Sequence, residues 1–166
     1  YLTGFLKSQG RQSSQADLGL ELVLRLFTKE ILQQVETQLK ASSATHPSIR
    51  FFLKHAETYQ NTVESVVRFL QGKDPLLQHR IQTRAFLPEG PRFESLKQLD
   101  QTTGDGISWA FGNLGSYDLA KHLASLYLDD LVDVFREGID SRFEFSKYAE
   151  KLAASVSSFD PLLKAL

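Results

Sequence analysis

Hydrophobic side chains recur along most of this chain at the three- and four-residue spacing of amphipathic helices. The clearest example runs from Pro47, a residue suited to the first turn of a helix, to Gly72, a residue suited to its end. Charged and polar side chains occupy the opposite face of this segment. Its apolar stripe consists of Ile49, Phe52, Leu53, Ala56, Tyr59, Val63, Val66, Val67 and Leu70. The spacing predicts one long helix here.

The start of the segment Leu18–Leu39 has a pattern that fits either a strand or a helix. Leucines alternate with other residues from Leu18 to Leu26, as they would in a strand. Leucine lacks the branched Cβ that strands favour, and Glu21 and Arg25 have the i,i+4 spacing of a helical ion pair. The apolar stripe continues at helical spacing through Leu20, Leu24, Phe27, Ile31, Val35 and Leu39. We therefore predict a helix over this whole segment.

The segment Tyr117–Phe135 carries two apolar stripes, so we expect it to be the most buried element, with Gly138 closing it. One stripe consists of Ala120, Ala124, Tyr127, Leu131 and Val134, and the other of Leu119, Leu123 and Leu126. Together with the stripe that begins at Ile49, these side chains predict a single core. We expect Leu53, Val63, Leu123 and Leu131 to lie in it.

Shorter helices are predicted around these long segments. The first is Tyr1–Gln9, which ends at Gly10, and the second is 74–85, which Asp74 and Pro75 start. The apolar residues of the second helix are Leu77, Ile81 and Ala85. A third helix is predicted over 140–156, capped by Asp140, and a last short one after Ser158–Asp160. Gln12–Asp17 is polar and fits a short strand. The pattern therefore predicts a mainly α fold, a helical bundle of about five to six helices with room for one short strand.

Two irregular segments separate the helices and are the predicted interaction surface. Phe86–Phe93 (FLPEGPRF) holds two prolines and a glycine, and Thr102–Gly115 (TTGDGISWAFGNLG) holds four glycines and the single Trp. Loops on a rigid scaffold carry a large share of function. The candidate interface residues are Phe86, Arg92, Trp109 and Phe111. Two other interpretations remain open: a small-ligand surface around Trp109, or packed connectors with Trp109 in the core.

Three arginines lie near the first of these loops. Arg80, Arg84 and Arg92 have the chemistry to clamp a carboxylate or phosphate group of a ligand. Ion pairs with Glu89 and Glu94 explain the same residues, and we favour this structural interpretation.

Metal-binding and catalytic motifs are absent from the sequence. Asp118 and His122 have i,i+4 spacing, as do Asp129 and Asp133, but no third ligand stands beside them in an HExxH pattern. The chain also lacks the glycine-rich nucleotide-binding motifs and the GxSxG nucleophile elbow. We therefore expect no bound metal or other cofactor and assign no catalytic residue.

Composition narrows the classes of partner. The 166 residues are 42% hydrophobic, which is enough to bury a core, and the net charge of −1 gives no electrostatic case for nucleic acid. No apolar run approaches the roughly 20 residues that span a membrane, and polar residues between Lys7 and Asp17 interrupt any secretory signal. Cysteine is absent, which excludes disulfides and thiolate-held clusters within the chain. We expect a cytoplasmic protein.

The opening segment YLTGFLKSQGRQSSQADLGLELVLRLF resembles the start of radical-SAM proteins that carry an N-terminal cobalamin-binding-like domain. The segments FLQGKDPLLQHRIQTRAFLPEGPRF and SRFEFSKYAEKLAASVSSFDPLLKAL resemble a helical region inside that domain in one subgroup. The resemblance implies a helix-strand-helix start of an incomplete Rossmann-like unit over residues 1–40 and a helical region over 41–166, forming one compact domain. The chain begins at Tyr1 and has no Met, so we expect a trimmed or processed segment, or a sequence that has lost its Met positions.

The same resemblance implies an accessory role next to a catalytic domain in the same polypeptide. S-adenosylmethionine, a 4Fe-4S cluster and cobalamin would then bind elsewhere in the parent protein. The CxxxCxxC cluster motif and the DxHxxG cobalamin motif are both missing here, so no cofactor residue carries over. The alternative from a different class is a free-standing helical protein-interaction module. A CxxxCxxC motif encoded after Leu166 would favour the first interpretation.

Overall fold

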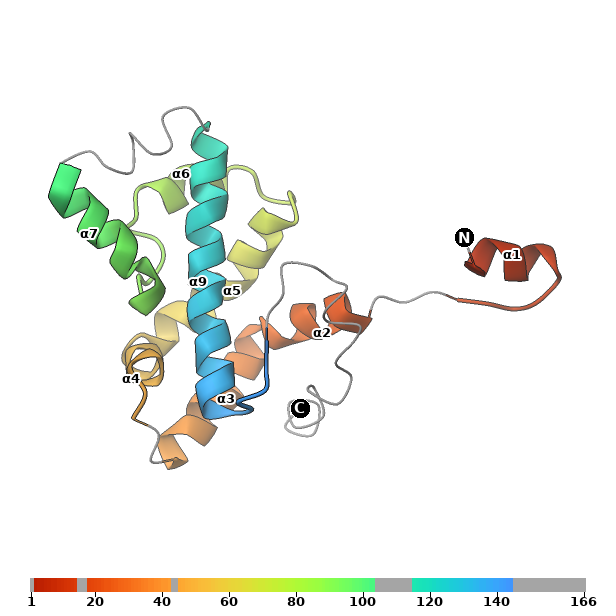
Figure 1. Cartoon of the computed structure of the whole chain (residues 1–166), viewed down its shortest axis with the longest axis horizontal. Helices are drawn as coiled ribbons and strands as arrows, with labels where there is room; N and C mark the ends of the chain where they lie inside the picture. The colour runs from red at the N-terminus through yellow and green to blue at the C-terminus, as the bar shows by residue number, and fades with distance from the viewer. Residues whose placement is uncertain (1, 15–17, 43–44, 104–114, 145–166) are drawn as a thin grey trace.

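The computed structural model describes residues 2–14, 18–42, 45–103 and 115–144, and these are mainly helical (Figure 1). The elements are α1 (Leu2–Ser8), α2 (Leu18–Leu26), α3 (Lys29–Ala41), α4 (Pro47–Lys54), α5 (Ala56–Leu70), α6 (Leu77–Gln82), the 3-10 helix η1 (Pro91–Phe93), α7 (Glu94–Thr103) and α9 (Ser116–Gly138). The mainly α prediction is confirmed, although these ranges hold eight α-helices where about five to six were expected. Residues 12–14 of the predicted strand form no regular element, and 15–17 lie outside the described residues.

The 23-residue helix α9 is the centre of the bundle. It contacts α4, α5, α6 and η1, and Figure 1 shows it running between them. All five members of its first predicted stripe are buried, which confirms the prediction. The largest fully buried side chains of the core are Tyr59, Tyr127, Phe27, Phe52, Phe69, Phe93, Phe135 and Phe143.

The two other segments predicted as single long helices are each divided in two. Thr28 separates α2 from α3: its side-chain oxygen accepts the N–H of Ile31 at 3.5 Å and caps the second helix. His55 separates α4 from α5, and its N–H still bonds to the carbonyl oxygens of Phe51 and Phe52. The divided halves have different main neighbours, because α4 packs chiefly on α9 and α5 chiefly on α3. Tertiary packing therefore overrides a spacing that one straight helix would satisfy equally well.

Glycine ends two helices as predicted. Gly10 and Gly72 have φ angles of +72° and +73°, a left-handed conformation that glycine adopts without a steric cost. The expected start of the next helix at Asp74 and Pro75 was wrong. α6 begins at Leu77, whose N–H bonds to the backbone oxygen of Asp74 at 3.3 Å. The Asp74 side chain is therefore not the helix cap.

Some side chains differ from the predicted burial pattern. Leu20 is 52% exposed while Leu22 and Leu26 are buried, so α2 is rotated relative to the stripe that was expected. Val63, Leu123 and Leu131 lie in the common core as predicted, but Leu53 is only partly buried against it.

The predictions for the end of the chain fall largely on residues 145–166, outside the described part. The predicted helix cap at Asp140 was wrong, because residues 140–144 form no helix. Asp140 instead starts a turn, in which its carboxylate accepts the N–H of Arg142 at 3.1 Å. Within the described residues, no helix is both long and apolar enough to cross a membrane.

Candidate functional site

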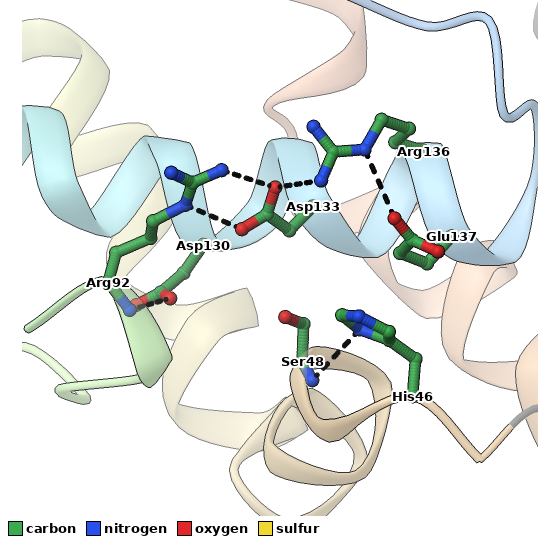
Figure 2. Close-up of polar contacts among 7 residues, drawn as sticks. All are labelled: His46, Ser48, Arg92, Asp130, Asp133, Arg136 and Glu137. Atoms are coloured by element: carbon green, nitrogen blue, oxygen red, sulfur yellow. Dashed lines mark hydrogen bonds and ion pairs between the residues drawn. The ribbon is translucent and has the colours of Figure 1, made fainter. Parts of the chain in front are cut away.

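The FLPEGPRF loop is fastened to the central helix by a cluster of acidic and basic side chains (Figure 2). Arg92, on η1, donates from Nε and Nη2 to the two oxygens of Asp133 on α9, at 2.6 and 2.7 Å. Arg136 donates to the same carboxylate at 2.8 Å and to Glu137 at 3.1 Å. The Asp133 side chain is only 8% exposed. Because both of its oxygens are bonded to arginines, this carboxylate anchors the loop to α9.

Asp130 lies one helical turn before Asp133 and is also buried. Its Oδ1 accepts the backbone N–H of Arg92 at 2.9 Å, while its Oδ2 is buried and makes no hydrogen bond within the described residues. The pKa of Asp130 is raised to about 6, mainly by burial and also by the nearby charge of Asp133. The N–H groups of Arg92 and Gly90 and the Arg92 guanidinium oppose this shift.

Gly90 allows this close approach of the loop to α9. A Cβ at this position would lie 2.6 Å from Cγ of Asp130 and closer still to its Oδ2. The backbone of Gly90 is extended, with a φ angle of −78°, so conformational freedom is not the reason for a glycine here. The reason is space, because the buried carboxylate occupies the volume that a side chain would fill.

We therefore expect Gly90→Ala to lower the free energy of unfolding by about 1–3 kcal/mol, the usual cost of overpacking. The cost should fall when Asp130 is also changed to Ala, since the obstructing carboxylate is then gone. Urea unfolding of the wild type, both single variants and the double variant measures this coupling. Equal costs of Gly90→Ala in the two backgrounds would contradict the close contact.

The other arginines near the loop make structural contacts. Arg84 donates from Nε and Nη2 to Glu89 at 2.5 and 2.7 Å, which confirms the pairing predicted for it. The guanidinium of Arg80 lies 4.2 Å from the centre of the Phe86 ring, a cation–π contact. Arg92, however, pairs with Asp133 and not with a glutamate as predicted. This correction follows from the packing of η1 on α9.

The structure describes two of the four predicted interface residues, Phe86 and Arg92. Phe86 is partly buried against the core, and Arg92 is held on α9, so the structure ties the two to different neighbours. Trp109 and Phe111 lie outside the described residues. Asp130 and Asp133 were missed as members of the site. Their sequence signal was available: they are acidic positions among the apolar stripes of the most buried helix, where a carboxylate needs a partner.

A second polar cluster lies deep in the core between α5 and α9. The hydroxyl of Tyr127 donates to the backbone oxygen of Tyr59 at 3.1 Å and lies 2.9 Å from the Thr62 hydroxyl. The two tyrosine rings stack with their centres 5.0 Å apart. Burial raises the pKa of both tyrosines well above their ordinary value, so they stay neutral and serve as packing and hydrogen-bonding groups.

Metal-ligand geometry is also absent from the part of the chain that the structure describes. No three His, Cys, Asp or Glu residues in it come together as a metal site. This includes the Asp118 and His122 pair and the Asp129 and Asp133 pair considered from the sequence.

Exposed apolar side chains form the remaining feature of the surface. Phe5 on α1 is 61% exposed, Leu20 on α2 is 52% exposed, and Leu76 before α6 is 79% exposed. Figure 1 shows α1 standing away from the rest of the bundle. Its neighbour in the structure is the segment that follows it, where the Ser13 hydroxyl donates to the backbone oxygen of Thr3 at 3.2 Å. These first two helices therefore offer apolar surface to a partner.

Comparisons with known proteins identify no family for this chain. No protein-family model matches the chain, and no curated protein or solved structure matches it either. The resemblance of the opening segment to radical-SAM proteins therefore stays a prediction.

Proposed function

We propose that this chain is the N-terminal accessory region of a cobalamin-type radical-SAM enzyme, and that it docks on the catalytic domain of the same polypeptide without catalysing the reaction itself. The observation that carries the proposal is the exposure of Phe5 on α1, a helix that stands apart from the bundle. Isolated helices shorter than about 12–15 residues are marginal in water, and α1 has seven. Such a helix gains stability when a partner covers its apolar side.

The location of the exposed residues supports the same proposal. Phe5 and Leu20 both lie in the opening segment that resembles radical-SAM proteins. Burying one such side chain is worth about 1.5–3 kcal/mol, which corresponds to roughly 10- to 100-fold in an equilibrium constant. With a net charge of −1, apolar burial would contribute more to docking than electrostatic attraction.

In this proposal the cofactors belong to the rest of the polypeptide. This chain has no cysteine, so a 4Fe-4S cluster would find no thiolate ligand in it. S-adenosylmethionine and cobalamin would bind with that cluster in the catalytic part, and the whole enzyme would work in the cytoplasm. The predicted surface formed by Phe86, Arg92, Trp109 and Phe111 would then shape access to the catalytic domain.

The alternative is a free-standing helical interaction module, in which a separate protein covers the same residues. The high exposure of Leu76, outside the opening segment, favours a second contact point of this kind. The full open reading frame distinguishes the two proposals. A CxxxCxxC motif after Leu166 supports the radical-SAM proposal, and a reading frame without one contradicts it.

Hydrogen exchange in the full-length polypeptide tests the docking itself. Phe5→Ser with Leu20→Ser is expected to make the α1 amides exchange at least about tenfold faster, because the apolar contacts with the catalytic domain are lost. Leu76→Ser is the control: it removes an even more exposed apolar side chain from a different place and should leave α1 unchanged. If the α1 amides exchange as fast in the wild type as in the double variant, α1 is not docked.

A further inference from the structure

One buried carboxylate beside the FLPEGPRF loop, that of Asp130, lacks a cation in direct contact. Three carboxylates, those of Asp129, Asp130 and Asp133, lie on five consecutive residues of α9, and each raises the pKa of the Arg92 guanidinium. Asp133 takes the ion pairs with both Arg92 and Arg136 (Figure 2). Asp130 is left with a backbone N–H on one oxygen and no hydrogen bond on the other. The most buried negative charge of the cluster is therefore the one without a cation in direct contact.

We propose that the turn at residues 90–93 is a pH-sensitive latch, which closes on α9 when Asp130 is protonated and opens more readily when Asp130 is ionised. In the closed turn, Gly90 and Arg92 cover the Asp130 carboxyl group and keep water from it. An ionised carboxylate is costly in such a place and lies beside a second carboxylate. Opening the turn exposes the group to water, where ionisation has no such cost. The latch is independent of the function proposed above.

The direction of the effect follows from linkage. In the closed turn the pKa of Asp130 is about 6, and an exposed aspartate has a pKa of about 3.9. A group with a raised pKa stabilises the closed form fully at low pH and loses this contribution as the pH rises through the raised value. The opening equilibrium should therefore increase by about 100-fold over the whole range, and by about tenfold between pH 5 and pH 8.

Charged and titratable groups also lie on the elements that pack on α9. Arg92 on η1 attracts the ionised form, and Asp133 on α9 repels it. Tyr59 on α5 stays neutral because its pKa is raised. On α6, Arg80 lies over the Phe86 ring.

His46, the N-cap of α4, is an imidazole on another element that contacts both α9 and η1. Its Nδ1 accepts the N–H of Ser48 at 3.3 Å, and imidazoles in general change charge near neutral pH. His46→Gln therefore serves as the control variant.

The test is the exchange of the Arg92 amide, which donates its hydrogen to Asp130. Its exchange rate relative to the intrinsic rate at each pH should rise about tenfold from pH 5 to pH 8 in the wild type. Asp130→Asn should remove this dependence, and His46→Gln should keep it. A carbon-13 titration of the Asp130 carboxyl group should give a midpoint near 6.

Two results would overturn the latch. One is a relative exchange rate of the Arg92 amide that is the same at pH 5 and pH 8 in the wild type. The other is a carboxyl titration midpoint near that of an exposed aspartate. The titration uses the wild-type protein, so it decides the question even if Asp130→Asn does not fold.

Discussion

Replacing Phe135 with alanine is expected to lower the free energy of unfolding by about 3–5 kcal/mol, as truncations of buried aromatic residues do. Phe135 has no exposed surface and lies on the central helix. Its ring centre is 5.7 Å from that of Phe27 and 5.9 Å from that of Phe143, so it joins the start and the end of the described core. The cavity left by alanine would therefore be lined by residues from three separate parts of the chain.

Urea unfolding followed by circular dichroism measures this cost. Phe5→Ala is the matched control, because it makes the same change on a side chain that is 61% exposed and should cost less than about 1 kcal/mol in the isolated chain. Similar costs for the two variants would show that Phe135 is not in the core.

Leu131→Ala is expected to cost about 2–5 kcal/mol, and Leu53→Ala clearly less. The sequence pattern placed both leucines in one core, whereas the structure buries Leu131 completely and Leu53 only partly. The same chemical group is removed in each case, so the difference reports burial alone. The two variants measured side by side in urea provide the comparison. A larger loss for Leu53→Ala than for Leu131→Ala would contradict the orientation of α4.

The central helix could be predicted from the sequence because its own apolar residues indicate that it is buried. A helix that is apolar around most of its circumference must be covered on several sides. The alternation of Leu18 to Leu26 was correctly assigned to a helix for a similar local reason, the preference of strands for β-branched residues. These conclusions need no knowledge of what lies across the core.

The breaks at Thr28 and His55 could not be predicted in the same way. Each lies inside a continuous apolar stripe, and a straight helix would satisfy the local spacing equally well. Only the neighbours decide, since α4 packs chiefly on α9 while α5 packs chiefly on α3. Thr28 did give a weak local signal, because threonine is a favoured N-cap residue.

The loop anchor depends on residues that are far apart in the sequence. Arg92 and Asp133 are separated by 41 positions, and glutamates much closer to Arg92 looked like equally good partners. Gly90 is a similar case, because the carboxylate that leaves no room for a side chain there belongs to Asp130, on a helix far away in the sequence. Patterns in the sequence identify such residues as unusual, but their partners are fixed by how η1 meets α9.

The central position of α9 has a consequence for synthesis on the ribosome. Tyr127 bonds to Tyr59 across 68 residues of sequence, and α4, α5 and α6 are all synthesised before residues 116–138. Until then, the apolar faces of these earlier helices have no α9 to pack against, and exposed apolar surface invites aggregation. The nascent chain would depend on chaperones for longer than a bundle of neighbouring hairpins would, and its folding would be completed late.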